Sequence, residues 1–142
     1  MSSIHPRRNA RERTLEALFA QQFSDENPQL VLDRILKSNS NKEKNLKFIQ
    51  LLFFCVLDNI TMADKLIKSH LQNWEFDRVA QIDLLLLRMG ICEIFFLEDI
   101  PPKVSISEMV EISKTYSTDE SPSFINGILD AVYKDYKNQD DN

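Results

Sequence analysis

The chain has 142 residues, of which 43% are hydrophobic and 27% charged, and its formal net charge is −5. This length suits one domain with a buried core, and the composition excludes an intrinsically disordered chain. Two glycines and five prolines are too few for the turns of a sheet-rich domain, so we expect an all-α fold. Both cysteines lie in apolar runs, which indicates a reduced, cytoplasmic protein without a disulfide framework.

The first predicted helix spans residues 6–23, and its start is rich in arginine. Residues 7–13 hold four arginines and one glutamate, a local charge of +3 that leaves −8 on the remainder. Cations are unfavourable at this end of a helix because its unsatisfied N–H groups carry partial positive charge. At 100° per residue, Arg7 and Arg11 lie about 40° apart and Arg8 about 60° farther round. Three guanidinium groups on one side favour a polyanion site, the alternative being a solvated basic tip.

Apolar spacing predicts further helices around residues 31–36, 46–71, 78–97, 105–113 and 121–132. The second of these segments is long enough to form the spine of the domain, with a bend near residues 59–61 as an alternative. The third is apolar on nearly every side, which is typical of a helix at the centre of a domain.

Several local signals refine these helices. Asp77 is a good cap for the helix that follows it, and Ser105 and Glu108 have the spacing of a capping box. Gly90 and Gly127 fall inside helical patterns, so we expect another helix to approach each closely. The polar tail, residues 135–142, is expected to fray.

Catalytic and metal-binding patterns are missing from the sequence. His5 and His70 are far apart, and neither belongs to a metal-ligand pair. A glycine-rich phosphate loop is also lacking. Cys55 and Cys92 are interpreted as core residues. We therefore expect a binding protein with no catalytic residue, no metal and no cofactor. A membrane span is not expected, since charged residues interrupt the apolar stretch 82–97.

Three groups of residues together resemble the NusB family of bacterial transcription antitermination factors. The first is the start, Arg7-Arg8-Asn9-Ala10-Arg11-Glu12 followed by Ala17-Leu18-Phe19. The second is the middle, Arg78-Val79-x-x-Ile82-Asp83 and Leu87-Arg88-Met89-Gly90-Ile91-Cys92-Glu93-Ile94. The third comprises Ile100-Pro101-Pro102-Lys103-Val104 and Phe124-Ile125-Asn126-Gly127-Ile128-Leu129-Asp130. The likeness covers nearly the whole chain.

This resemblance implies one RNA-binding domain, residues 1–142, made of two small helical bundles packed across one another. About six or seven helices are expected, in subdomains of about 1–74 and 75–142. NusB-like proteins bind single-stranded boxA RNA as a heterodimer with NusE, a ribosomal protein of the small subunit. The complex joins transcribing RNA polymerase, suppresses termination and so promotes ribosomal RNA transcription. Some members self-associate, so a homodimer is possible.

The resemblance also assigns functional positions. The RNA-binding positions are Arg7, Arg8, Asn9, Arg11, Glu120 and Phe124. Asn9 replaces a residue that is basic in many members, which implies a weaker patch. The partner-binding positions are Phe19, Asp77 and Asp83. Core packing is the alternative role for Phe124 and Phe19, and capping for Asp77. Asp83 lies in a nearly all-apolar helix and needs either water or a cationic partner.

Two alternatives to an antitermination factor stay open. A similar domain precedes the catalytic part of ribosomal RNA cytosine methyltransferases; since the sequence ends at Asn142, we expect it to lack a nucleotide-cofactor domain. A helical protein–protein adaptor without RNA binding is the other alternative, and alanine replacement of Arg7, Arg8 and Arg11 would then leave nucleic-acid binding unchanged.

Overall fold

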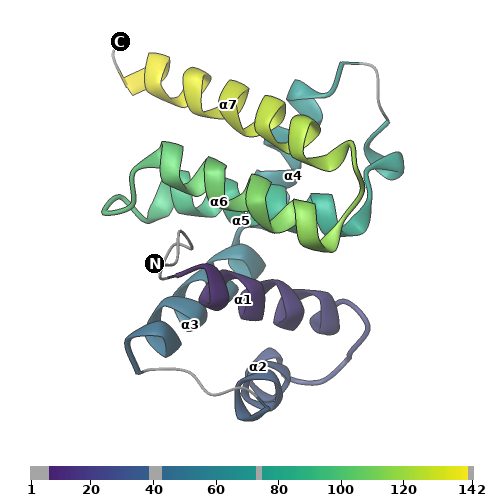
Figure 1. The fold of residues 1–142 in the computed structure, drawn as a ribbon, viewed down its shortest axis with the longest axis vertical. Coiled ribbons are helices and arrows are strands. Elements are labelled where there is room, and N and C mark those ends of the chain that lie inside the picture. Colours follow the sequence, from purple (N-terminus) through teal and green to yellow (C-terminus); the bar gives the residue numbers. More distant parts are fainter. Residues whose placement is uncertain (1–6, 39–42, 73–74, 141–142) are drawn as a thin grey trace. The chain divides into compact units, whose positions relative to one another are not determined.

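A computed structural model describes residues 7–38, 43–72 and 75–140, with the side chains of residues 43, 44 and 140 excepted. Within these ranges every regular element is a helix, as expected from the shortage of glycine (Figure 1). The elements are α1 (Arg8–Gln21), α2 (Pro28–Lys37), α3 (Glu43–Asp58), α4 (Ile60–His70), the 3-10 turn η1 (Phe76–Arg78), α5 (Gln81–Phe96), α6 (Pro102–Tyr116) and α7 (Ser121–Asp140). The all-α prediction is confirmed.

The chain divides into two compact units, residues 1–57 and 58–142. The long apolar segment is not one helix, because Asn59 separates α3 from α4 at the alternative bend foreseen from the sequence. The division lies earlier than the boundary expected near residue 74. The reason is that α4 packs on α5 and α7 and so belongs to the second unit.

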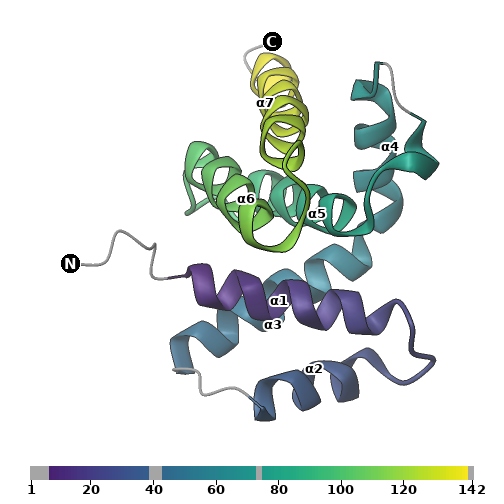
Figure 2. The ribbon, with the colours of Figure 1, turned by 45° about the vertical axis from the view of Figure 1, so that its right-hand side comes forward.

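In the first unit, α1 packs on α2 and crosses α3 (Figure 2). Asn27 caps α2, since its Oδ1 accepts a hydrogen bond from the Gln29 backbone N–H at 2.8 Å, and Pro28 occupies the first helical position. Asn41, a residue type suited to capping the next helix, lies outside the described residues. Apolar residues of all three helices are buried together: Ala10, Leu15, Leu18, Val31, Leu32, Phe48, Ile49, Leu52, Phe53 and Val56.

The second unit is built around α5, which contacts α4, α6 and α7. Its residues from Leu85 to Ile94 are almost all buried, which confirms a central position for this all-round apolar helix. Helix α7 packs closely against α5 at Gly90, since a Cβ at this position would lie 2.6 Å from Cδ1 of Leu129 on α7. The close neighbour at Gly90 is thus a side chain. Gly127 differs from the prediction, because among the described residues, its own helix backbone and chain neighbours aside, no atom lies within 4 Å of the corresponding Cβ position.

Two predicted helix starts in the second unit were wrong. Asp77 lies inside η1, and α5 begins at Gln81 after the N-cap residue Ala80. Helix α6 begins at Pro102, whose ring presets the backbone angle of a first helical position. Ser105 therefore lies within the helix, where its hydroxyl donates to Glu93 Oε1 at 2.7 Å instead of capping.

The segment expected to fray, residues 135–142, is helical as far as Asp140, the last residue of α7, and residues 141–142 lie outside the described ranges. Two side-chain contacts hold its last turns. His70 Nε2 donates to Asp135 Oδ2 at 2.7 Å, and the Tyr136 ring lies 4.4 Å from the Phe95 ring, centroid to centroid. These contacts join α7 to α4 and α5.

No single helix within the described ranges is long and apolar enough to cross a membrane, although α3 and α4 taken together have the length and composition.

Candidate nucleic-acid interface

The arginine-rich segment forms the start of α1. Arg7 is the N-cap residue, its side chain makes no capping hydrogen bond, and the first turn contains no acidic residue. Arg7 and Arg8 are half-buried and Asn9 is exposed. The local field is therefore positive from both the helix end and the side chains, which is the arrangement expected for anion binding.

Arg11 departs from its predicted place on the surface. Its side chain is fully buried, with 0% of its area exposed, so the core of the first unit reaches a full turn beyond Leu15 toward the helix start. Arg13 is also largely covered and makes an ion pair with Glu16 at 3.0 Å.

A ring from α3 completes this region. The guanidinium carbon of Arg7 lies 4.5 Å from the centroid of the Phe48 ring, and that of Arg11 lies 5.3 Å from it. Both distances are in the range of cation–π interactions. Phe48 was not among the predicted site residues, because a contact between residues some forty positions apart leaves no local periodic signal.

Asp83 is buried in the second unit, with 5% of its area exposed. Its Oδ1 accepts a hydrogen bond from the Ser117 hydroxyl at 2.6 Å, and its Oδ2 accepts one from the Ser121 hydroxyl at 2.9 Å. Ser121 is also the first residue of α7 and accepts a hydrogen bond from the Thr118 backbone N–H at 3.1 Å. Hydroxyl groups thus fill the role for which water or a cation was expected, and they fix the turn between α6 and α7.

That turn carries the two remaining RNA-binding positions. Glu120 is exposed, and Phe124 lies one turn into α7 and is half-buried. Phe124 borders a groove of about 440 Å³ between the end of α4 and the exposed side of α7, where Gly127 and Gln72 also line it. An aromatic edge beside an open groove can stack on an unpaired base.

The other partner-binding positions are accessible. Phe19 is 39% exposed on α1, so it is not a core residue, and its ring lies edge-on to the more exposed Phe23 at 5.2 Å. Asp77 is exposed on η1. The predicted positions therefore fall into two sets: Arg7 to Phe19 belong to the first unit, whereas Asp77, Asp83, Glu120 and Phe124 belong to the second.

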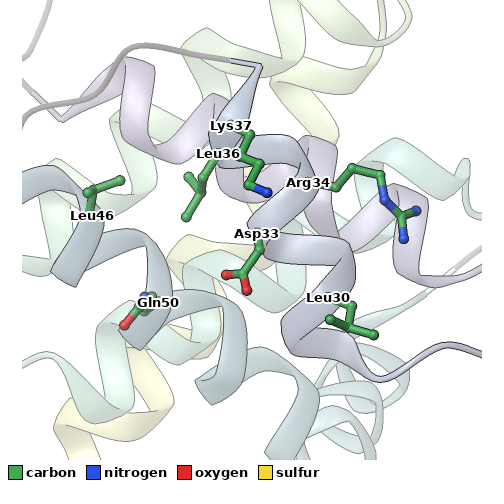
Figure 3. A pocket seen from close by; sticks show the side chains of 7 residues that line it. All are labelled: Leu30, Asp33, Arg34, Leu36, Lys37, Leu46 and Gln50. Carbon is green, nitrogen blue, oxygen red and sulfur yellow. The ribbon is translucent and has the colours of Figure 1, made fainter.

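A separate groove of about 610 Å³ lies between α2 and α3, and none of the predicted site residues lines it. Figure 3 shows Leu36 and Leu46 facing one another across it, while the Arg34 side chain points away. Arg34 is paired with Glu26 at 2.5 Å. Arg34 and Lys37 therefore supply positive charge on the same unit outside the arginine-rich start of α1.

The helices of the described residues and the arginine-rich start of α1 are features shared with helical nucleic-acid-binding proteins. Residues 8–134 match the NusB family. The transcription antitermination protein NusB of Chloroherpeton thalassium is 41% identical over 96% of this chain, and the match spans 65% of that protein. The corresponding protein of Salinibacter ruber is 37% identical over 94% of this chain and 84% of its own length. The chain belongs to the NusB family.

Solved structures agree with this assignment. NusB of T. maritima superposes with a TM-score of 0.83 at 35% identity, and the match covers 92% of each chain. A crystal structure of the antitermination factors NusB and NusE in complex with double-stranded RNA contains a chain with a TM-score of 0.80 at 27% identity. That match covers 92% of this chain and 97% of the other. The resemblance seen in the sequence motifs is thereby confirmed.

Proposed function

We propose that this protein is a transcription antitermination factor that binds boxA RNA together with NusE and acts in the RNA polymerase complex that transcribes ribosomal RNA. The observation that carries the proposal is the arginine-rich start of α1 in a NusB-family chain. The relative with 27% identity that was solved with NusE and RNA supports the choice of partners.

The arginines are not equivalent in this proposal. Arg7 and Arg8 keep part of their surface exposed and contact RNA phosphates. Arg11 is buried and supports these two residues from within the core of the first unit. Asn9 is exposed beside them and can donate a hydrogen bond, although it adds no charge. Phe124 stacks on an unpaired base, and Glu120 lies next to it.

NusE binds at the exposed positions Phe19 and Asp77. Asp83 contributes by fixing the turn before α7, since both its oxygens already accept hydrogen bonds from serine hydroxyls. The net charge of −5 suits a basic ribosomal partner, because complementary charge raises the rate of encounter and suppresses wrong partners.

The test is binding of a labelled boxA-like single-stranded RNA across a salt series, with and without NusE. Alanine replacement of Arg7 and Arg8 should weaken binding and make the salt dependence shallower by roughly 0.7 in log–log slope for each lost phosphate contact. The matched control is the double replacement Arg34→Ala and Lys37→Ala, which removes the same charge from another surface of this unit. The control should leave both quantities nearly unchanged.

The pattern of results separates this function from an adaptor role. If RNA binds neither alone nor with NusE while NusE itself still binds, the protein is a protein–protein adaptor. If both double variants weaken RNA binding equally, the effect is one of net charge and the start of α1 is not a specific site.

A further inference from the structure

One aromatic ring lies against two arginines of the proposed RNA site. Arg11 follows Arg7 by one helical turn, and its backbone N–H donates to the Arg7 carbonyl at 2.9 Å. Both side chains therefore project from the same side of α1 toward α3. There the Phe48 ring lies 4.5 Å from the Arg7 guanidinium carbon and 5.3 Å from that of Arg11.

Burial differs along this stack. Phe48 is 6% exposed and Arg11 is 0% exposed, so both belong to the core of the first unit. Arg7 is half-buried and retains accessible surface. The ring therefore belongs to the core, while Arg7, one of the two guanidinium groups that it contacts, still reaches solvent.

The contact with the ring reduces the conformational entropy that the Arg7 side chain loses when it binds an anion. A free arginine side chain samples many rotamers, and immobilising it on a phosphate costs conformational entropy. A guanidinium held by a ring has lost part of that freedom before the RNA arrives. A cation–π contact involves the positive charge and the ring, and it does not itself use the N–H groups with which a guanidinium donates to phosphate oxygens.

We propose that Phe48 is a positioning residue for RNA binding: its ring, anchored in the core beside Arg11, holds the Arg7 guanidinium ready to receive a backbone phosphate. This inference rests on the proposed RNA-binding function and adds to it a residue of α3 that does not itself touch RNA.

The test compares the variants Phe48→Leu and Phe48→Tyr in the full chain, with the boxA-like RNA and NusE. Leucine keeps an apolar side chain but removes the ring, and we expect RNA affinity to fall roughly three- to tenfold, the range of a cation–π contact and one newly mobile side chain. Tyrosine keeps the ring, and affinity should stay within about twofold of the unmodified protein.

Phe53→Leu is the matched control for loss of core packing. Phe53 is on the same helix, is fully buried, and has its ring edge-on to Phe54 at 5.0 Å. This variant should lower the melting temperature at least as much as Phe48→Leu, yet its folded form should bind RNA with unchanged affinity at a temperature well below melting.

A double-mutant cycle with Arg7→Ala gives the decisive readout. If Phe48 acts through Arg7, Phe48→Leu should cost little or nothing further once Arg7 is alanine. Fully additive losses, or equal losses in Phe48→Leu and Phe53→Leu, would overturn the positioning role while leaving RNA binding itself intact. Absence of RNA binding by the unmodified protein would instead remove the proposed function, and this inference with it.

Discussion

Each unit buries one charged side chain that the sequence placed in a binding role, and the two are accommodated in different ways. Arg11 in the first unit lies against the ring of Phe48, which Arg7 also contacts. Asp83 in the second unit accepts hydrogen bonds from the hydroxyls of Ser117 and Ser121. An aromatic ring that contacts one cation can still contact a second. A carboxylate oxygen that already accepts a short hydrogen bond is less available to another donor.

The consequence is a difference in function. The ring in the first unit can support a second, partly exposed guanidinium, so burial there builds a binding surface. The hydroxyl cluster in the second unit is directed inward, and it fixes the start of the helix that carries Phe124. Whether a buried charge at a predicted site contributes to binding therefore depends on which neighbouring groups its partners leave accessible to a ligand.

The largest expected effect in this comparison is that of Arg11→Ala. Removing a fully buried side chain leaves a cavity beside Phe48, and we expect a loss of about 3 kcal/mol in the free energy of unfolding. The control is Arg8→Ala, whose half-buried side chain should cost less than about 1 kcal/mol. Urea unfolding measures both. Equal, small losses would mean that Arg11 is not part of the core.

Asp83→Ala should cost about 2 kcal/mol, because it deprives the hydroxyls of Ser117 and Ser121 of their acceptor. Asp77→Ala is the control, since that exposed carboxylate should contribute less than about 0.5 kcal/mol. The same variants in a NusE titration separate the two roles: binding should weaken for Asp77→Ala in the folded protein. Asp83→Ala with unchanged stability but lost NusE affinity would contradict the inward role.

The smallest expected effect on stability is that of adding a side chain at Gly127 in the second unit. Gly127→Ala should stabilise the protein by up to about 1 kcal/mol, because alanine favours the helix and its Cβ would meet no atom of another described side chain or helix within 4 Å. Gly90→Ala is the contrasting variant, since Leu129 must move and stability should fall. Thermal unfolding of the two variants gives the sign of each change. A destabilised Gly127→Ala would point to a packing partner for that side of α7.

Sequence reasoning predicted those features that depend on composition and local periodicity. The helical class follows from the shortage of glycine and proline, and the central position of α5 from its apolar residues on nearly every side. The apolar spacing over residues 46–71 indicated one long helix, and the break at Asn59 was foreseen only as an alternative. The side of α1 that carries Arg7 and Arg11 was also predictable from 100° per residue.

Features that depend on contacts between distant residues were not predictable. The burial of Arg11 requires Phe48 of another helix, and the environment of Asp83 requires serines more than thirty positions away. The start of α6 was misplaced because Ser105 matched a capping box, whereas the ring of Pro102 presets a helical start three residues earlier. The roles of Glu120, Phe124 and Phe19 came from the family resemblance and remain predictions.

The contacts at the end of α7 set a limit on how the protein can be shortened or tagged. Deleting residues from Asp135 onward would remove the hydrogen-bond partner of His70 and uncover the Phe95 ring, even though composition marks that segment as a dispensable tail. Shortened versions for crystallisation or display should therefore keep Tyr136, and a fused reporter is best attached after Asp140 through a flexible linker.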